Sequence, residues 1–185
     1  MRIVAGDFRS RKIEAVTGES TRPTTDKVKE AVFSRIGPYF DGGEMLDLFA
    51  GSGNVSFEAL SRGIETSLMC DKQRKAIETI KRNSKTLQVE KRCVIWQMDY
   101  KKALKKIVEE QRQFDFIYLD PPYKEQKIID ILTFLEEHDV IKPYADIVCE
   151  TLKEDEFPEI IGSLHKVKEV IYGITRITYY KKESI

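Results

Sequence analysis

The strongest constraint on the fold is a regular alternation of short apolar runs with amphipathic helical stretches. The apolar runs have the length and continuity of buried parallel strands, and they occupy residues 45–49, 66–70, 94–96, 114–119 and 145–149. After four of these runs, apolar residues recur at the spacing of an amphipathic helix. These helical stretches are residues 54–62, residues 72–83, a stretch bearing Ala103, Leu104, Ile107 and Val108, and a stretch bearing Ile128, Ile129, Leu132 and Leu135. This alternation predicts a doubly wound α/β domain.

The C-terminal end of the chain has a different pattern. Residues 166–172 and 174–180 flank Gly173 and alternate between apolar and polar side chains. We expect them to form an antiparallel hairpin, which would close a mostly parallel sheet of about seven strands.

The composition fits one domain of ordinary size. The chain has 185 residues, of which 41% are hydrophobic, with Lys+Arg 31 and Asp+Glu 31. No apolar segment is long enough to span a membrane, and the first residues lack the apolar core of a secretion signal. The cysteines Cys70, Cys93 and Cys149 and the two histidines lack the spacing of a metal site or a disulfide framework, so we expect a cytoplasmic protein without a metal.

A glycine loop follows the first predicted strand. Gly51 and Gly53 let the backbone approach a ligand at the start of the next helix. Asp71 ends the following strand about 20 residues later, the spacing at which a carboxylate meets ribose hydroxyls. Ser56 replaces the third glycine of the dinucleotide pattern, and Asp47 would repel a pyrophosphate. The loop therefore predicts a nucleoside cofactor without phosphates and with a cationic group.

S-adenosylmethionine has these properties. Its ribose would bind Asp71, and its positively charged amino-acid end would lie near Asp47. Asp99 follows the strand at residues 94–96, where the adenine amino group needs an acceptor. Each acid alone has a simpler interpretation as a helix N-cap or a solvated loop residue. Three acids at successive strand ends, together with the glycine loop, favour the cofactor site.

The segment Asp120-Pro121-Pro122-Tyr123 follows the apolar run at residues 114–119. Two prolines cannot continue a sheet, so they fix a stiff loop at the strand end. The Asp120 carboxylate and the Pro121 carbonyl can accept the two N–H bonds of an amino group, while the Tyr123 ring stacks on a flat base. The alternative is a proline turn with a surface Asp and a packed Tyr.

The first forty residues are locally basic, and we expect residues 1–40 to form an arm and helix preceding a catalytic domain at residues 41–185. The helix should begin near Thr25 or Asp26 and end at Gly37. Such an arm suits contacts with phosphates, although an ordinary solvated extension has the same composition. The candidate phosphate-binding residues are Arg9, Arg11, Lys12, Arg22 and Thr24.

Together these segments resemble the RsmD family of bacterial small-subunit ribosomal RNA guanine-N2 methyltransferases. The resemblance covers nearly the whole chain. The glycine loop and the Asp-Pro-Pro-Tyr segment also occur in other amino-group methyltransferases, so the N-terminal Arg-Pro-Thr-Thr-Asp segment is what narrows the family. The resemblance rests on residues 2–6, 9–13, 21–33, 46–53, 58–63 and 120–123.

The resemblance implies a Rossmann-like class I methyltransferase fold with a small N-terminal extension. It implies that the cofactor is bound by Asp47, Phe49, Ala50, Gly51, Gly53, Asp71 and Asp99, and that the target base is held by Asp120, Pro121, Pro122 and Tyr123. Two departures are visible. Cys70-Asp71 stands where the family usually has an apolar residue and Glu, and residues 54–56 are Asn-Val-Ser instead of small apolar residues.

The implied activity is transfer of a methyl group from S-adenosylmethionine to the exocyclic N2 of a guanine in 16S ribosomal RNA, which leaves S-adenosylhomocysteine. The expected partner is the RNA within a small-subunit assembly particle, and the expected state is a monomer. Two alternatives stay open: a DNA adenine-N6 methyltransferase, and a non-catalytic RNA-binding assembly factor with the same fold. The chain shows no further domain for reading a DNA sequence, which counts against the first.

Overall fold

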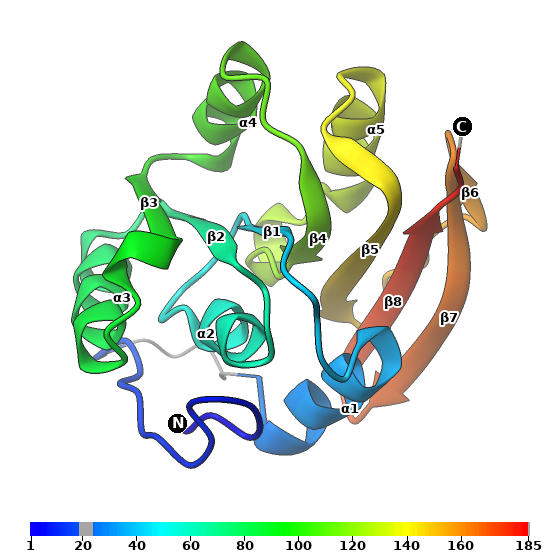
Figure 1. The fold of residues 1–185 in the computed structure, drawn as a ribbon. Helices are drawn as coiled ribbons and strands as arrows, with labels where there is room; N and C mark the ends of the chain where they lie inside the picture. The colour runs from blue at the N-terminus through cyan, green and yellow to red at the C-terminus, as the bar shows by residue number, and fades with distance from the viewer. Residues whose placement is uncertain (19–23, 185) are drawn as a thin grey trace. The chain divides into compact units, whose positions relative to one another are not determined.

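The computed structural model describes residues 1–18 and 24–184. The chain divides into two compact units, Met1–Ala103 and Leu104–Ile185, which we call unit 1 and unit 2 and describe separately. Figure 1 traces the chain from blue at the N-terminus to red at the C-terminus. Within the described ranges, no helix is long and apolar enough to cross a membrane.

Unit 1 contains three parallel strands in the order β3-β2-β1. They are β1 (Glu44–Asp47), β2 (Thr66–Asp71) and β3 (Cys93–Gln97). Asp47 pairs with Met69, and Asp71 pairs with Gln97, so the carboxyl ends of the three strands reach the same edge. The buried side chains of this sheet include Met45, Leu46, Leu68, Met69, Cys70 and Trp96.

Three helices lie wholly within unit 1. α1 (Asp26–Ile36) is capped at its N-terminus by Thr25, whose hydroxyl accepts a hydrogen bond from Val28 N at 3.3 Å. α2 (Asn54–Ser61) is buried along its whole length, and α3 (Arg74–Thr86) is amphipathic. A single 3-10 turn, Glu90–Arg92, precedes β3, and α4 (Tyr100–Glu109) begins in unit 1 and continues into unit 2.

The N-terminal segment, residues 1–18, is folded back and attached to unit 1. Arg2 and Lys12 form an antiparallel bridge, and Ile3 N donates to Arg11 O at 2.9 Å. Ile3 and Ile13 are buried, with exposed fractions of 1% and 6%. In Figure 1 this segment runs beside α2 and α3. The basic composition of the segment does not reveal this attachment, because it depends on isolated apolar residues.

Unit 2 contains five strands in the order β4-β5-β8-β7-β6. β4 (Phe114–Leu119) and β5 (Ile141–Leu152) are parallel, whereas β8 (Thr175–Lys182) is antiparallel to both β5 and β7 (Leu164–Tyr172). A short strand, β6 (Ile160–Ile161), pairs with β7. Between β4 and β5 lie a 3-10 turn, Tyr123–Glu125, and α5 (Ile128–Glu137).

The predicted alternation of strands and helices is confirmed, and so is the antiparallel hairpin around Gly173. The expected count of about seven strands was low, since the described residues form eight. The difference is β6, which has two residues and is too short to show a period. β5 also begins earlier than predicted. The prediction started too late because Pro143 and Tyr144 interrupt the apolar pattern of the strand.

One member of the predicted apolar stripe of α5 does not face the core. Ile129 is 43% exposed, whereas the buried residues of this helix are Ile128, Ile131, Leu132 and Leu135. The buried residues follow a stripe spaced three and four residues apart from Ile128, and Ile129 lies outside that stripe.

Candidate active site

The carboxyl ends of β1, β2 and β3 bring the predicted cofactor residues of unit 1 to one edge. Asp47 and Asp71 are the last residues of β1 and β2, and Asp99 comes two residues after β3. Met98 N donates to Asp71 O at 3.1 Å, which ties the end of β3 to the end of β2. The rings of Phe49 and Tyr100 lie 5.4 Å apart, which joins the glycine loop to the start of α4.

The glycine loop contacts Asp71 directly. Gly51 N donates to Asp71 Oδ2 at 2.9 Å, and Gly53 N donates to Ala50 O at 2.8 Å. Both glycines have positive φ, 57° and 83°. A Cβ on Gly53 would lie 2.5 Å from the Phe57 ring, so that glycine is required for packing. A Cβ on Gly51 would meet no atom within 4 Å, so its backbone borders open space.

Asp71 and Asp99 are half-buried, and both also stabilise helix starts. Asp71 Oδ1 accepts from Gln73 N at 2.9 Å, just before α3. Asp99 Oδ1 accepts from Lys101 N at 2.8 Å in the first turn of α4. The N-cap interpretation is therefore correct for Asp99, which directly precedes α4, whereas Asp71 lies two residues before Gln73, the N-cap of α3. It does not exclude a ligand, because a carboxylate offers about four acceptor positions.

Asp47 is buried at the end of β1, shortly before the glycine loop. Its side chain is almost fully buried, with 2% exposure, and Ser56 Oγ donates to Asp47 Oδ2 at 2.7 Å. Burial raises the pKa of Asp47 to about 7, the hydrogen bond from Ser56 opposes that rise, and the negative charge of Asp71 adds to it. Ser56 also lies 2.9 Å from Ser67 Oγ, so the departure from an apolar residue at position 56 has a structural role.

The Asp-Pro-Pro-Tyr segment of unit 2 leaves the buried strand β4. Asp120 is half-buried and Pro121 is buried, whereas Pro122 is exposed and Tyr123 is 45% exposed. Pro122 O accepts from Glu125 N at 3.0 Å and so closes the short turn after the prolines. The segment therefore combines a fixed backbone with an accessible aromatic ring.

The candidate phosphate-binding residues have different surroundings. Arg9 and Lys12 are exposed, whereas Arg11 is held by a hydrogen bond from its Nη2 to Thr86 O at 2.6 Å. Thr24 is half-buried, and its carbonyl accepts from Asn54 Nδ2 at 3.2 Å. Arg22 lies outside the described residues.

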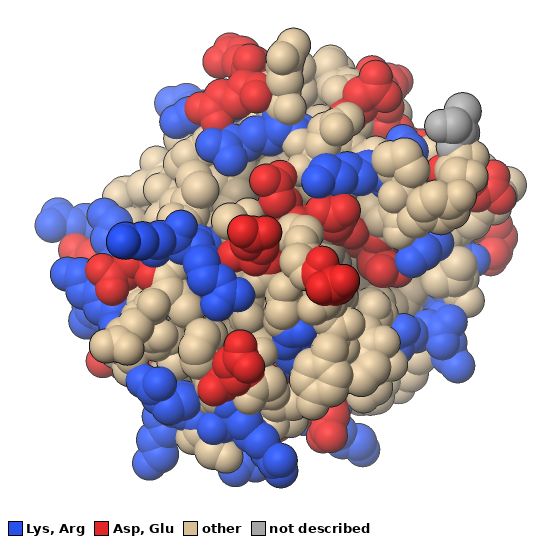
Figure 2. All heavy atoms as spheres, in the orientation of Figure 1, with Lys and Arg blue, Asp and Glu red and all other residues tan. Residues whose placement is uncertain are grey.

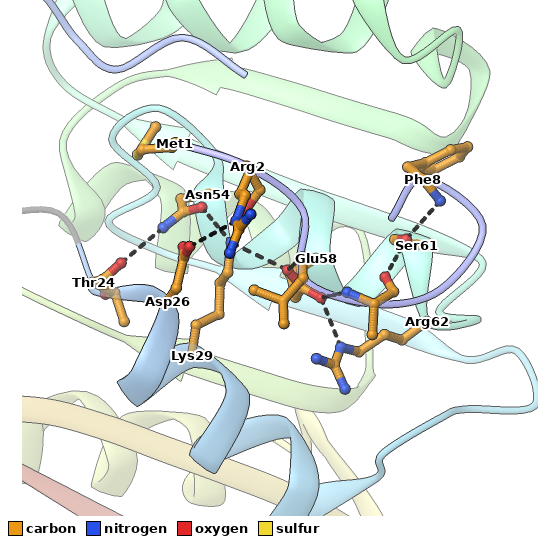
Figure 3. Close-up of polar contacts among 12 residues, drawn as sticks. Met1, Arg2, Phe8, Thr24, Asp26, Lys29, Asn54, Glu58, Ser61 and Arg62 are labelled. Carbon is orange, nitrogen blue, oxygen red and sulfur yellow. Dashed lines mark hydrogen bonds and ion pairs between the residues drawn. The ribbon is translucent and has the colours of Figure 1, made fainter. Parts of the chain in front are cut away.

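A buried ion cluster, which sequence reasoning missed, joins the N-terminal segment to α1 and α2 (Figure 3). Lys29 Nζ lies 3.1 Å from Glu58 Oε1, and Arg62 Nε lies 2.8 Å from Glu58 Oε2. Burial lowers the pKa of Lys29 from its ordinary value, although Glu58 opposes that change. Glu58 also accepts hydrogen bonds from Val4 N and Ala5 N at 2.8 and 3.1 Å.

The polar face of α2 thus holds the N-terminal segment, and we call it the α2 clamp. Ser61 Oγ accepts from Phe8 N at 2.9 Å and donates to Ala5 O at 2.6 Å. Lys29 Nζ donates to Arg2 O at 2.7 Å and to Asn54 Oδ1 at 2.9 Å, which explains Asn at position 54. Spacing of three and four residues places the clamp residues on one face of the helix; they are Asn54, Glu58, Ser61 and Arg62.

The sequence contained a partial signal for the clamp. Glu58 and Arg62 are an acid and a base four residues apart in a helix that otherwise has small and apolar residues, an arrangement that favours an ion pair. Lys29 gave no such signal, because a lysine between apolar residues of an amphipathic helix usually lies in solvent.

Comparison with known proteins agrees with this fold. A family described as Conserved hypothetical protein 95 matches residues 1–181. The putative rRNA methyltransferase YlbH of Bacillus subtilis is 47% identical over 184 residues, which are 100% of both chains. The ribosomal RNA small subunit methyltransferase D of Haemophilus influenzae is 37% identical, covering 83% of this chain and 80% of its own.

Solved structures show the same similarity. The putative methyltransferase yhhF of Escherichia coli has a TM-score of 0.83 and 26% identity, and the match covers 100% of this chain and 99% of the other. A conserved hypothetical protein of Streptococcus pyogenes has a TM-score of 0.80 and 38% identity, covering 84% of this chain and 96% of the other.

The strand order, the glycine loop and these similarities define a Rossmann-like class I methyltransferase fold, as the sequence predicted. Within that class, the chain belongs to the RsmD family, the ribosomal RNA small subunit methyltransferase D proteins. Among residues 1–18 and 24–184, no group of three or more His, Cys, Asp or Glu side chains is arranged to hold a metal ion.

Proposed function

We propose that this protein is an S-adenosylmethionine-dependent methyltransferase that acts on small-subunit ribosomal RNA, at the exocyclic N2 of a guanine. The names of its relatives support ribosomal RNA methylation. The observation that carries the proposal is the edge of unit 1, where the half-buried Asp71 accepts a hydrogen bond from Gly51, a glycine with open space beside it. The proposed substrate is the RNA within a small-subunit assembly particle, and the proposed active state is a monomer.

The residues of unit 1 fit the cofactor. The Asp71 carboxylate would accept from the two ribose hydroxyls, and the Asp99 carboxylate from the adenine amino group, since each carboxylate has about four acceptor positions. The open side of Gly51 gives the ligand close access to the backbone, and Phe49 and Ala50 are the half-buried residues before it. When bound, the cofactor supplies an electrophilic methyl group on a sulfonium.

Asp47 interacts with the cofactor through its charge. Its carboxyl is buried and bonded to Ser56, so it would act electrostatically on the cationic end of the ligand. A nearby positive charge favours the carboxylate over the neutral acid. A bound cofactor would therefore favour the ionised form of Asp47.

The residues of unit 2 fit the target base. The Asp120 carboxylate and the Pro121 carbonyl accept the two N–H bonds of the guanine amino group, and the half-exposed Tyr123 ring stacks on the extruded base. These two hydrogen bonds would make the nitrogen more pyramidal and more nucleophilic and would fix the direction of its lone pair toward the methyl group that the cofactor supplies.

The test is methyl transfer with a labelled donor. Small-subunit particles from cells lacking the protein, naked 16S ribosomal RNA and duplex DNA are offered in parallel, and the labelled nucleoside is identified by mass spectrometry. We expect N2-methylguanosine in the ribosomal substrates. Labelled N6-methyladenosine in DNA would instead identify a DNA methyltransferase, and no S-adenosylmethionine binding by calorimetry would identify a non-catalytic assembly factor.

The same assay tests the role of Asp120. The change Asp120→Ala should lower turnover by about a hundredfold or more while cofactor affinity stays near that of the wild type, since the side chain contacts the base and not the cofactor. Asp130→Ala is the matched control, because Asp130 is an exposed acid in the first turn of α5. Near-normal turnover of the Asp120 variant would refute the assignment.

A further inference from the structure

One side of α3 is strongly basic, although the whole chain has no net charge. Five Lys and Arg residues lie on its exposed side against a single exposed acid, Glu78. Spacings of three, four and seven residues keep them on one face, while Ala76, Ile77 and Ile80 face the core. The five basic residues are Arg74, Lys75, Lys81, Arg82 and Lys85.

The N-terminal segment brings further basic residues to the same side. Asn83, which is 1% exposed, forms two hydrogen bonds with the backbone of Glu14. Its Oδ1 accepts from Glu14 N at 2.8 Å, and its Nδ2 donates to Glu14 O at 3.0 Å. Arg11 Nη2 bonds Thr86 O at the end of the helix. Residues 11–14 are thus held against the C-terminal half of α3, and exposed Lys12 lies between these contacts.

Ion pairs neutralise only part of this charge. Arg82 pairs with Glu14 at 2.7 Å and Arg74 pairs with Glu78 at 3.0 Å, and all four side chains are about half exposed or more. Exposed pairs of this kind contribute little, so a phosphate can compete for the arginines. In the described part of the chain, no acid forms an ion pair with Lys75, Lys81 or Lys85. Figure 2 shows blue side chains gathered at the left and lower left, over α3 and the N-terminal segment.

We infer that the exposed side of α3, together with the N-terminal segment, binds the phosphate backbone of the RNA substrate. We call this surface the α3 basic face: Lys12, Arg74, Lys75, Lys81, Arg82 and Lys85. The inference rests on the proposed function and extends it beyond the target base. Lysines and arginines displayed on a helix neutralise phosphates without reading bases, so the surface sets the position of the RNA and contributes salt-dependent affinity.

The attachment of the N-terminal segment to α3 distinguishes the α3 basic face from an ordinary solvated helix face. α4 also carries exposed lysines, at Lys101, Lys102 and Lys105. The described residues show no second basic segment hydrogen-bonded to α4, whereas α3 has one fixed by the buried Asn83. α4 therefore provides a control with the same residue type in the same secondary structure.

The experiment compares two double variants with equal spacing and equal loss of charge. Lys81→Ala/Lys85→Ala removes two cations from the α3 basic face, and Lys101→Ala/Lys105→Ala removes two from α4. Binding of fluorescently labelled 16S ribosomal RNA is measured by anisotropy over a range of KCl concentrations. For the α3 variant, we expect the dissociation constant near 0.1 M salt to rise about tenfold and the slope of log K against log salt to decrease by about 2.

The α4 variant should bind as the wild type does. Equal losses in both variants would contradict the inference, since they would show a general effect of net charge, and an α3 variant with unchanged affinity and slope would also contradict it. Thermal unfolding and S-adenosylmethionine binding should be unchanged in both, because all four lysines are exposed. The binding assay needs no methyl transfer, so a failure of the proposed reaction at guanine N2 would be seen separately.

Discussion

Individual residues of the proposed cofactor site combine structural and ligand-binding roles, and Asp47 shows this most clearly. Its folded pKa of about 7 lies well above the ordinary value of 3.8, mainly because the carboxyl is buried. Between these pH values the folded protein holds a proton that the unfolded chain has lost. The contribution of Asp47 to stability therefore falls as the pH rises from about 4 to about 7 and changes little above that.

This titration predicts a pH dependence of cofactor affinity. Because the cationic ligand favours the ionised carboxyl, affinity for S-adenosylmethionine should increase as the pH rises through about 7. Asp47→Asn should remove that increase and stabilise the empty protein at pH values above the titration. Calorimetry of both proteins at several pH values checks this, and the comparison cancels the titration of the ligand itself. Parallel pH profiles for the two proteins would contradict the role of Asp47.

The two glycines of the loop should respond differently to alanine. Gly53→Ala places a methyl group against the Phe57 ring, so the main expected effect is a lower unfolding temperature. Gly51→Ala meets no protein atom, and its positive φ costs only about 1 kcal/mol, but the added methyl occupies the space proposed for the ligand. We expect Gly51→Ala to lose at least tenfold in cofactor affinity. Normal affinity in this variant would place the cofactor elsewhere.

At the scale of single elements, α2 links the glycine loop to the N-terminal segment. Its first turn follows Gly53, and its polar face carries the α2 clamp. The clamp fixes the start of the segment that we propose to contact RNA. One buried helix therefore positions residues for both ligands, which explains why its side chains are polar along an otherwise buried surface.

Glu58→Gln tests the clamp. The change leaves the buried Lys29 and Arg62 without their anion, so we expect a loss of about 3 kcal/mol in the free energy of unfolding. Hydrogen exchange at the amides of Val4 and Ala5 should also become faster, since Glu58 accepts both. Glu78→Gln, which breaks the exposed pair with Arg74, should change stability by less than about 1 kcal/mol. Unchanged exchange at Val4 and Ala5 would refute the clamp.

The sequence predicted those elements whose local pattern is strong. β4 matches its predicted bounds, and the strand ends that carry Asp47 and Asp71 follow from apolar runs. Within the α2 clamp, only the pair of Glu58 and Arg62 had a signal in the sequence. The partners Val4 and Lys29 could not be predicted, because they are up to 54 residues from Glu58 and bind it through a backbone N–H and a buried charge. Attachment of the basic segment to α3 depends on a buried asparagine, which has no periodic signal.

At the scale of the whole molecule, the residues proposed to bind the cofactor and those proposed to hold the base belong to different units. Unit 1 carries the acids and glycines assigned to the cofactor, together with the α3 basic face, while unit 2 carries the Asp-Pro-Pro-Tyr segment assigned to the base. This division predicts that a change in one unit impairs one step and leaves the other intact. The comparison needs one acid from each unit. Asp71 and Asp120 are suitable because Asp71 ends the buried strand β2 and Asp120 directly follows the buried strand β4.

Asp71→Ala should weaken S-adenosylmethionine binding by at least tenfold, because it removes the acceptors for the ribose and the contact with Gly51, while RNA affinity stays near that of the wild type. Asp120→Ala should retain affinity for both ligands and lose the transfer step. Calorimetry, RNA anisotropy and single-turnover transfer measured on the same preparations distinguish these outcomes. If saturating S-adenosylmethionine restored full transfer in the Asp120 variant, the base-holding role would be wrong, because added donor cannot replace a group that aligns the acceptor nitrogen.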